Sequence, residues 1–255
     1  MSVVRERALL LATGSQEWVP PVPRPASTLV LIRDGEHGIE TFLMRRPLTM
    51  RFAPGMSVYP GGALDDADFE ASITEELDRE YAEVNAIRAS ATEPEYRALL
   101  ACAIRETHEE AGVKFADARE VVLTDHWVTP EHESRRFDVR FFIARIPEGQ
   151  VATVTNEEAD HAEWIRPHDA LERHRRDELP MLRPTLEMLR FLGEFETSEQ
   201  AITAAHSRDV VARMPRATPV GENDLSWHIV NERTGEVIET NVVPPALLET
   251  GGISQ

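Results

Sequence analysis

Short apolar runs separated by polar turn residues dominate the first part of the chain and are typical of β-strands. Residues 28–33 and 39–46 are two such runs, and the Asp-Gly-Glu-His-Gly segment between them predicts a β-hairpin. The proline-rich stretch 18–27 predicts an extended arm before the hairpin, because proline disfavours a helix there. After residue 46 the pattern predicts a loop with one short strand near residues 56–59.

A long amphipathic helix is predicted over residues 92–111. Thr92 is a capping residue, Pro94 lies in the first turn and Glu95 stands three residues after the cap, which together mark a helix start. Gly112 supplies the stop. The apolar residues that recur at helical spacing are Leu99, Leu100, Ala103 and Ile104.

The later elements alternate between strands and helices. Strands are predicted at 120–128, 137–146 and 162–165, and helices at 167–175 and 184–195. Residues 69–91 are acidic and helix-prone without a clear period, and beyond residue 197 only a late hairpin (227–230 with 236–239) is predicted. This order predicts a mixed α/β (α+β) domain over 26–196, with an N-terminal arm at 1–25 and a C-terminal extension at 197–255.

The charge balance limits the kinds of molecule that the protein is expected to bind. The chain has 27 Lys and Arg against 45 Asp and Glu, a formal net charge of −18. A surface this acidic repels nucleic-acid phosphates and anionic lipid. We therefore expect no nucleic-acid partner and no membrane partner. Cys102 is the single cysteine, which excludes an internal disulfide framework and suits a reducing compartment. We expect a soluble, cytoplasmic protein, because no apolar run is long enough to span a membrane and the terminal Ile-Ser-Gln is not a peroxisomal address.

A cluster of carboxylates lies near the end of the predicted long helix. Glu106 and Glu110 are four residues apart and Glu109 lies between them, so their side chains project from neighbouring positions of one face. Such carboxylates repel one another unless a cation is present, and Mg²⁺ and Mn²⁺ prefer oxygen ligands. Arg105 stands four residues before Glu109 and is placed to form an ion pair with it.

These residues, together with an upstream glycine pair, resemble the Nudix box. The first half of that box is a glycine, then any five residues, then a glutamate. After any seven residues the second half follows: Arg-Glu, an aliphatic residue, any residue, Glu-Glu, any residue, a glycine and an aliphatic residue. Gly62 takes the first glycine, and Arg105, Glu106, Glu109 and Glu110, followed by Gly112 and Val113, match the second half. Asp68 replaces the first glutamate and Thr107 an aliphatic residue, and residues 69–104 stand where the family has seven, an insertion of 29 within the box.

An interrupted box resembles the subgroup that includes the peroxisomal coenzyme A diphosphatase (Nudix motif 19 type) and its bacterial relatives. Further segments look like this subgroup: Phe52-Ala53-Pro54-Gly55, Tyr59-Pro60-Gly61-Gly62, Trp127-Val128-Thr129-Pro130, Arg135-Arg136-Phe137-Asp138 and Glu163-Trp164-Ile165-Arg166-Pro167. The resemblance covers residues 26–196. It implies a mixed β-sheet sandwiched between helices, with a helical insertion at about 69–97 inside the box and a C-terminal extension.

The resemblance also implies an activity, namely metal-dependent hydrolysis of a pyrophosphate that links a nucleoside diphosphate to another group. Glu106, Glu109, Glu110 and the carbonyl of Gly61 would bind Mg²⁺ or Mn²⁺, and Arg105, Glu106 and Glu109 would form the catalytic set. The general base stays open between a box glutamate and a later carboxylate, Glu157 or Glu158. The substrate also stays open: coenzyme A or its acyl esters, NADH, ADP-ribose, other nucleotide sugars or capped nucleotides.

Outside the box the signals are weaker. Arg45, Arg46 and Arg51 form a basic group that either binds substrate phosphates or ends a strand at the surface, and Arg136 is a similar candidate. The nine histidines show no metal-ligand spacing. We expect Cys102 to be a small buried hydrophobic residue.

Two other classes of function and several structural questions stay open. A nucleotide sensor without catalysis and an acidic interaction module that uses residues 69–91 are the alternatives to an enzyme. The extension at 197–255 is a dimer arm, a lid or a packing strand, and a homodimer, which is common in the family, is not decided by any residue.

Overall fold

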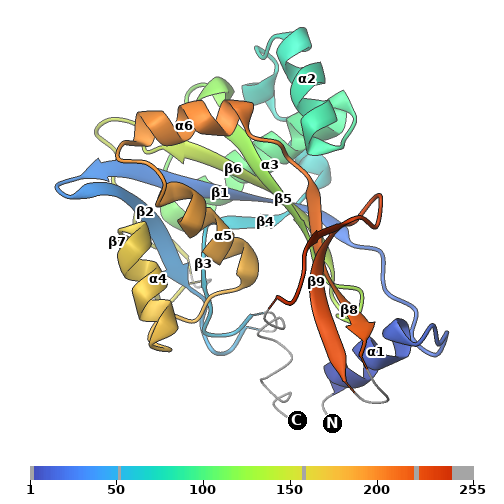
Figure 1. Ribbon diagram of the computed structural model, residues 1–255. Helices are drawn as coiled ribbons and strands as arrows, with labels where there is room; N and C mark the ends of the chain where they lie inside the picture. Colours follow the sequence, from blue (N-terminus) through green and yellow to red (C-terminus); the bar gives the residue numbers. More distant parts are fainter. Residues whose placement is uncertain (1–2, 51–52, 157–158, 221–223, 243–255) are drawn as a thin grey trace. The chain divides into compact units, whose positions relative to one another are not determined.

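The computed structural model describes residues 3–50, 53–156, 159–220 and 224–242 of the chain. It divides into two compact units, one formed by residues 26–125 and 140–210 and the other by residues 1–25, 126–139 and 211–255. A mixed β-sheet with helices confirms the predicted α+β class (Figure 1). The boundaries predicted at residues 25 and 196 stay a prediction.

The larger unit is built on strands that follow the order β5, β6, β1, β2 and β3, with β4 paired to β1 and β7 to β2. β1 and β2 form the predicted hairpin, with Gly35 opposite Gly38 at its turn. β4 was not predicted, because its two glycines have little strand propensity, and pairing with β1 makes it a strand. The bounds are β1 Arg24–Gly35, β2 Gly38–Arg45, β3 Ser57–Val58, β4 Gly61–Ala63, β5 Val122–Val128, β6 Phe137–Arg145 and β7 His161–Ile165.

The helices of the larger unit include the long helix that the sequence predicts. Helix α3 begins with the Thr92–Glu95 capping box and ends at Gly112, whose φ of 71° is left-handed. Helices α4 and α5 pack against each other, and α2 packs against α3 (Figure 1). The bounds are α2 Arg79–Ala89, α3 Glu93–Ala111, α4 Pro167–Arg175, α5 Arg183–Leu192 and α6 Ser198–Ser207, with short 3₁₀ helices η1 Asp66–Glu70, η2 Ser72–Thr74 and η3 Ala118–Glu120.

The main hydrophobic core of this unit lies between the sheet and α3. Leu29 and Leu31 of β1 and Phe42 of β2 are buried in one cluster with the apolar face of α3. The α3 residues in this cluster are Tyr96, Leu99, Leu100, Ala103 and Ile104. Val30 and Ile32 are also fully buried, so β1 is covered on both faces. The core therefore fixes the helix that carries the carboxylate cluster against the central strand of the sheet.

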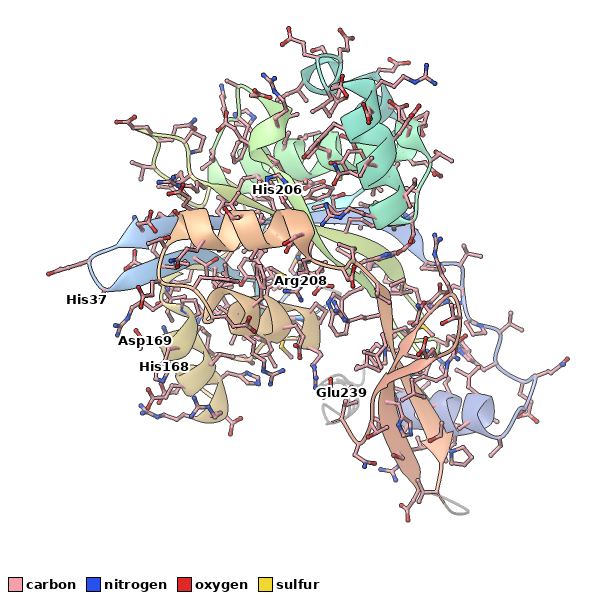
Figure 2. The ribbon with its side chains drawn as sticks, turned by 45° about the horizontal axis from the view of Figure 1, so that its top comes forward. His37, His168, Asp169, His206, Arg208 and Glu239 are labelled. Atoms are coloured by element: carbon pink, nitrogen blue, oxygen red, sulfur yellow. The ribbon has the colours of Figure 1, made fainter. Side chains whose placement is uncertain are left out.

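Helix α6, which the sequence pattern did not predict, is attached to strand β1. Its buried positions are the small residues Ser198, Ala201 and Ala205, which give a weak amphipathic signal. The N–H and the hydroxyl of Ser198 both donate to the Asp34 carboxylate at 2.7 Å. Arg208 directly follows the helix and bonds to the buried Asp125 of β5 at 3.2 Å (Figure 2). Long-range polar contacts therefore position α6.

The smaller unit contains α1 (Val3–Ala12), β8 (Ala212–Pro219), β9 (Leu225–Asn231) and β10 (Val237–Glu239). β8 and β9 are antiparallel, and β10 pairs with β9, which confirms the predicted late hairpin. β8 was missed because it contains two prolines, which disfavour strands. It pairs in parallel with the end of β5, at His126 opposite Ala212. Within the described ranges of both units, every helix is too short or too polar to cross a membrane.

Replacing Ser198 with alanine should lower the free energy of unfolding by about 1 kcal/mol, because one hydrogen bond to a carboxylate is lost. Burial raises the pKa of Asp34, but the hydrogen bonds from Ser198 and the charge of Arg145 outweigh it and lower the pKa overall. The stabilisation by ionised Asp34 is thus present above its unfolded pKa and is lost as the pH falls through the lower folded value. Urea unfolding of wild type and Ser198→Ala at pH 7 and in acid measures both effects.

Ser207→Ala is the matched control, because the Ser207 hydroxyl bonds only to Ala204 of its own helix in an exposed position. Equal unfolding midpoints for the two variants at pH 7 would contradict a stabilising contact between α6 and β1.

Candidate active site

The last two turns of α3 carry the four charged residues that the sequence singled out. The Glu110 side chain is buried, with an exposed fraction of 3% for the residue, while the Glu109 side chain is 52% exposed. Arg105 lies among the carboxylates: its Nη1 is 2.8 Å from Glu106 Oε1 and 3.4 Å from Glu109 Oε2. The expected ion pair between Arg105 and Glu109 is therefore present, and it extends to Glu106.

Strand β4 brings the glycine pair directly against these glutamates. The N–H of Gly61 donates to Glu110 Oε2 at 2.9 Å. At Gly62 a Cβ would overlap the Glu106 carboxylate, so a larger residue would displace that glutamate. At Gly61 a Cβ would lie 2.8 Å from the Cα of Thr28 on the paired strand. The close approach of β4 to β1 therefore requires glycine at position 61, and glycine at position 62 leaves the Glu106 carboxylate where it lies.

Asp68 connects the two halves of the box, which the insertion separates in the sequence. Its side chain is 2% exposed and accepts two hydrogen bonds from Arg105, Nε to Oδ1 at 2.8 Å and Nη2 to Oδ2 at 3.0 Å. The N–H of Asp65, the residue that caps η1, also donates to Oδ2, at 2.8 Å. Hydrogen bonding to Asp68 is the largest cause that raises the pKa of Arg105, although burial opposes it. An aspartate suffices because η1 packs directly on α3.

The insertion folds back onto the helix that it precedes. It runs through η1, η2 and α2, and α2 packs along α3 (Figure 1). Arg97, near the start of α3, donates to the carbonyls of Thr74 and Leu77 and so ties the insertion to the helix. A groove of about 320 Å³ lies between η1, η2 and this helix start, with the half-exposed Phe69 in its wall.

Two residues within the box helix are structural. Thr107, which replaces an aliphatic residue, is fully buried, and its hydroxyl donates to the Ala103 carbonyl at 2.7 Å, so its polar atom is satisfied. Cys102 is buried between α3 and β4, and burial raises the pKa of its thiol to about 12, with smaller contributions from Asp68 and Glu106. The thiol is therefore protonated at neutral pH, as expected for a small buried hydrophobe.

The basic candidates occupy different places. Arg45 ends β2, and its Nε is 2.7 Å from Asp160 Oδ1, while the Asp160 N–H donates to the Arg45 carbonyl at 3.0 Å. The backbone of Arg46 pairs with Met56 and Gly55 in the loop that follows. Arg51 lies outside the described residues. Sequence reasoning missed Asp160, since one carboxylate in an acidic stretch gives no distinct signal.

Arg136 belongs to the smaller unit and is engaged there. Its guanidinium donates to the carbonyls of Thr129 and Pro21 at 2.9 and 3.0 Å, and burial lowers its pKa. These bonds favour a structural role over the predicted contact with substrate phosphates. The two candidate bases, Glu157 and Glu158, lie outside the described residues.

Comparison with known proteins identifies the family. The model of the NUDIX domain matches residues 23–185. The chain belongs to the NUDIX domain family. A crystal structure of the NUDIX hydrolase from Alicyclobacillus acidocaldarius is similar, with 28% identity, a TM-score of 0.59, and coverage of 71% of this chain and 96% of that chain. The curated Caenorhabditis elegans protein "Putative nudix hydrolase 7" is 25% identical over 142 residues, which are 51% of this chain but only 48% of that protein.

NUDIX hydrolases generally use divalent metals, and the donor set here suits such a cation. The oxygens of Glu106, Glu109 and Glu110 and the Gly61 carbonyl are hard donors, and glycine at position 62 leaves space for the Glu106 carboxylate. In the part of the chain that the structure describes, no three His, Cys, Asp or Glu side chains are grouped to hold an ion as they stand. Figure 2 shows His37 in the turn between β1 and β2, His168 on α4 and His206 on α6.

Replacing Asp68 with asparagine should lower the free energy of unfolding by about 2 kcal/mol, because a buried carboxylate that accepts charged hydrogen bonds is lost. The new amide would also direct a donor at the donors of Arg105 and Asp65. Urea unfolding of Asp68→Asn beside Asp66→Asn measures the effect, since Asp66 is exposed in the same 3₁₀ helix. A loss no larger than that of Asp66→Asn would show that the Asp68–Arg105 pair does not hold the two halves of the box together.

Proposed function

We propose that the chain is a divalent-metal-dependent pyrophosphohydrolase that cleaves a nucleoside diphosphate linked to another group. The observation that carries the proposal is the assembly of Gly61 and Gly62 against Glu106 and Glu110, across the insertion. A buried glutamate beside a glycine pair and a braced arginine favours a metal-dependent site over a solvated acidic surface.

The residues that would hold Mg²⁺ or Mn²⁺ are Glu106, Glu109, Glu110 and the carbonyl of Gly61. When bound, such a cation neutralises phosphate charge and lowers the pKa of a coordinated water. Arg105 bonds to both Glu106 and Glu109, and it thereby limits the orientations that these carboxylates adopt. When the cation binds, Glu106 and Glu109 would replace part of their contact with the Arg105 guanidinium by contact with the cation.

The reaction itself is a hydrolysis in which water adds to phosphorus and the bridging phosphorus–oxygen bond breaks. A carboxylate of the chain accepts the proton of the attacking water, and the candidates are a box glutamate, Glu157 and Glu158. Arg45 would bind a substrate phosphate through its guanidinium, which Asp160 holds in a fixed orientation.

Coenzyme A and its acyl esters are the substrates that we propose first. The support is the resemblance of the interrupted box and its flanking segments to the coenzyme A diphosphatase subgroup. The insertion packs on the box helix, and we propose that it contributes to specificity. A cytoplasmic location and a homodimer stay predictions.

A nucleotide sensor without catalysis is the alternative. It is favoured by the ion pairs of Arg105 with Glu106 and Glu109, which already provide these carboxylates with a cation. A sensor would bind a nucleotide without turnover.

Substituting Glu110→Gln should reduce hydrolysis at least about 100-fold, because even residues that only support metal ligands contribute 10- to 100-fold. The assay is a panel of coenzyme A, acetyl-coenzyme A, NADH, ADP-ribose, a dinucleoside polyphosphate and a nucleotide sugar, each with Mg²⁺ and with Mn²⁺. Chromatography separates the products. The Glu148→Gln variant, which changes an exposed loop glutamate, is the control and should retain wild-type activity.

Release of adenosine 3′,5′-bisphosphate from coenzyme A would support both the reaction and the substrate. Cleavage of another compound alone would retain the reaction and reject coenzyme A. No cleavage of any compound with either metal would reject the enzyme in favour of the sensor.

A further inference from the structure

The carboxyl end of α3 obtains hydrogen bonds from a distant loop. A helix leaves its last four carbonyls without partners of its own. The N–H of Gly112 donates a hydrogen bond to the His108 carbonyl at 3.0 Å, and the N–H of Thr153 donates one to the Ala111 carbonyl at 3.1 Å. The two carbonyls between them belong to Glu109 and Glu110.

Thr155 donates hydrogen bonds to both of these carbonyls. Its N–H donates to the Glu110 carbonyl at 3.1 Å, and its hydroxyl donates to the Glu109 carbonyl. The hydroxyl is thus the side-chain donor in an arrangement that otherwise uses backbone N–H groups. It acts on the peptide that carries the most exposed of the box glutamates.

This end of the helix needs such support for an electrostatic reason. The carboxyl end of a helix carries a partial negative charge, which disfavours further negative charge in the last turn. Glu106, Glu109 and Glu110 all lie in or next to that turn. Repulsion therefore favours fraying of the turn, and donors to its carbonyls oppose it.

The loop that holds Thr155 is itself fixed on both sides. Before it, Gln150 exchanges hydrogen bonds with the backbone of Lys114 at 2.8 and 2.6 Å. After it, Asp160 is bonded to Arg45 through both backbone and side chain. Since both sides are anchored, the hydroxyl of Thr155 contacts the helix from a defined position.

We propose that Thr155 is a positioning residue for the divalent cation: its hydroxyl fixes the backbone at Glu109, and thereby orients the carboxylates of Glu109 and Glu110. This inference rests on the proposed metal-dependent function. It adds a residue outside the Nudix box, on a loop 46 residues further along the chain than Glu109.

The test compares Thr155→Val with Thr153→Val in the full chain. Valine at 155 removes the hydroxyl but keeps the shape and the N–H. Thr153 lies in the same loop with an exposed side chain and contributes its N–H, which valine retains. Mn²⁺ binding is titrated by electron paramagnetic resonance, and the Mg²⁺ concentration for half-maximal hydrolysis is measured in parallel.

The expected result is an increase of about 10-fold in both metal constants for Thr155→Val, the lower end of the range for residues that orient ligands. Thr153→Val should match wild type, and Thr155→Ser should restore wild-type values because it restores the hydroxyl. Mn²⁺ constants for Thr155→Val within twofold of Thr153→Val would overturn the inference, as would failure of Thr155→Ser to restore them.

The two proposals fail separately. Wild-type protein that binds Mn²⁺ but hydrolyses nothing would reject the enzyme, while weaker Mn²⁺ binding by Thr155→Val would still support the positioning role. Wild-type protein that hydrolyses a substrate, with no difference in metal constants between the two valine variants, would reject only the role of Thr155.

Discussion

The crowding of negative charge at the end of one helix is the constraint on which the candidate site depends. Three glutamates lie in the last turns of α3, where the helix end is already negative. Arg105 compensates part of this charge, and Asp68 holds Arg105 through two hydrogen bonds. Backbone N–H groups from β4 and from the loop at residues 153–155 supply further donors. A divalent cation would complete this compensation, which is why we connect the geometry with metal-dependent chemistry.

The same network explains how the box tolerates a long insertion. The two halves meet through contacts that do not depend on the length of chain between them: the Asp68–Arg105 pair and the hydrogen bond from the Gly61 N–H of β4 to Glu110. Lengthening a loop costs little entropy once its ends are fixed. The insertion forms a folded layer of its own, with α2 packed on α3 and Arg97 bonded to its backbone.

Arginines that look alike in sequence have different roles in the structure. Arg45 is half exposed and oriented by one carboxylate, so it remains available to an anionic ligand. Arg136 is buried and donates to two backbone carbonyls and to the sulfur of Met214 within the smaller unit. Because a guanidinium has a limited number of donors, engagement with the backbone leaves Arg136 little capacity for phosphate.

The sequence by itself determined the features that depend on local chemistry. The capping box at Thr92, the stop at Gly112 and the apolar face of α3 define the helix and place its glutamates side by side, because helical spacing is a local property. The hairpin of β1 and β2 follows from its turn residues. Only the tertiary structure decided that β4 is a strand, that α6 is attached to Asp34, that Asp68 and Thr155 bond to the box helix, and that Asp160 bonds to Arg45. These depend on partners far away in the chain, and neither propensity nor periodicity encodes a contact between distant residues.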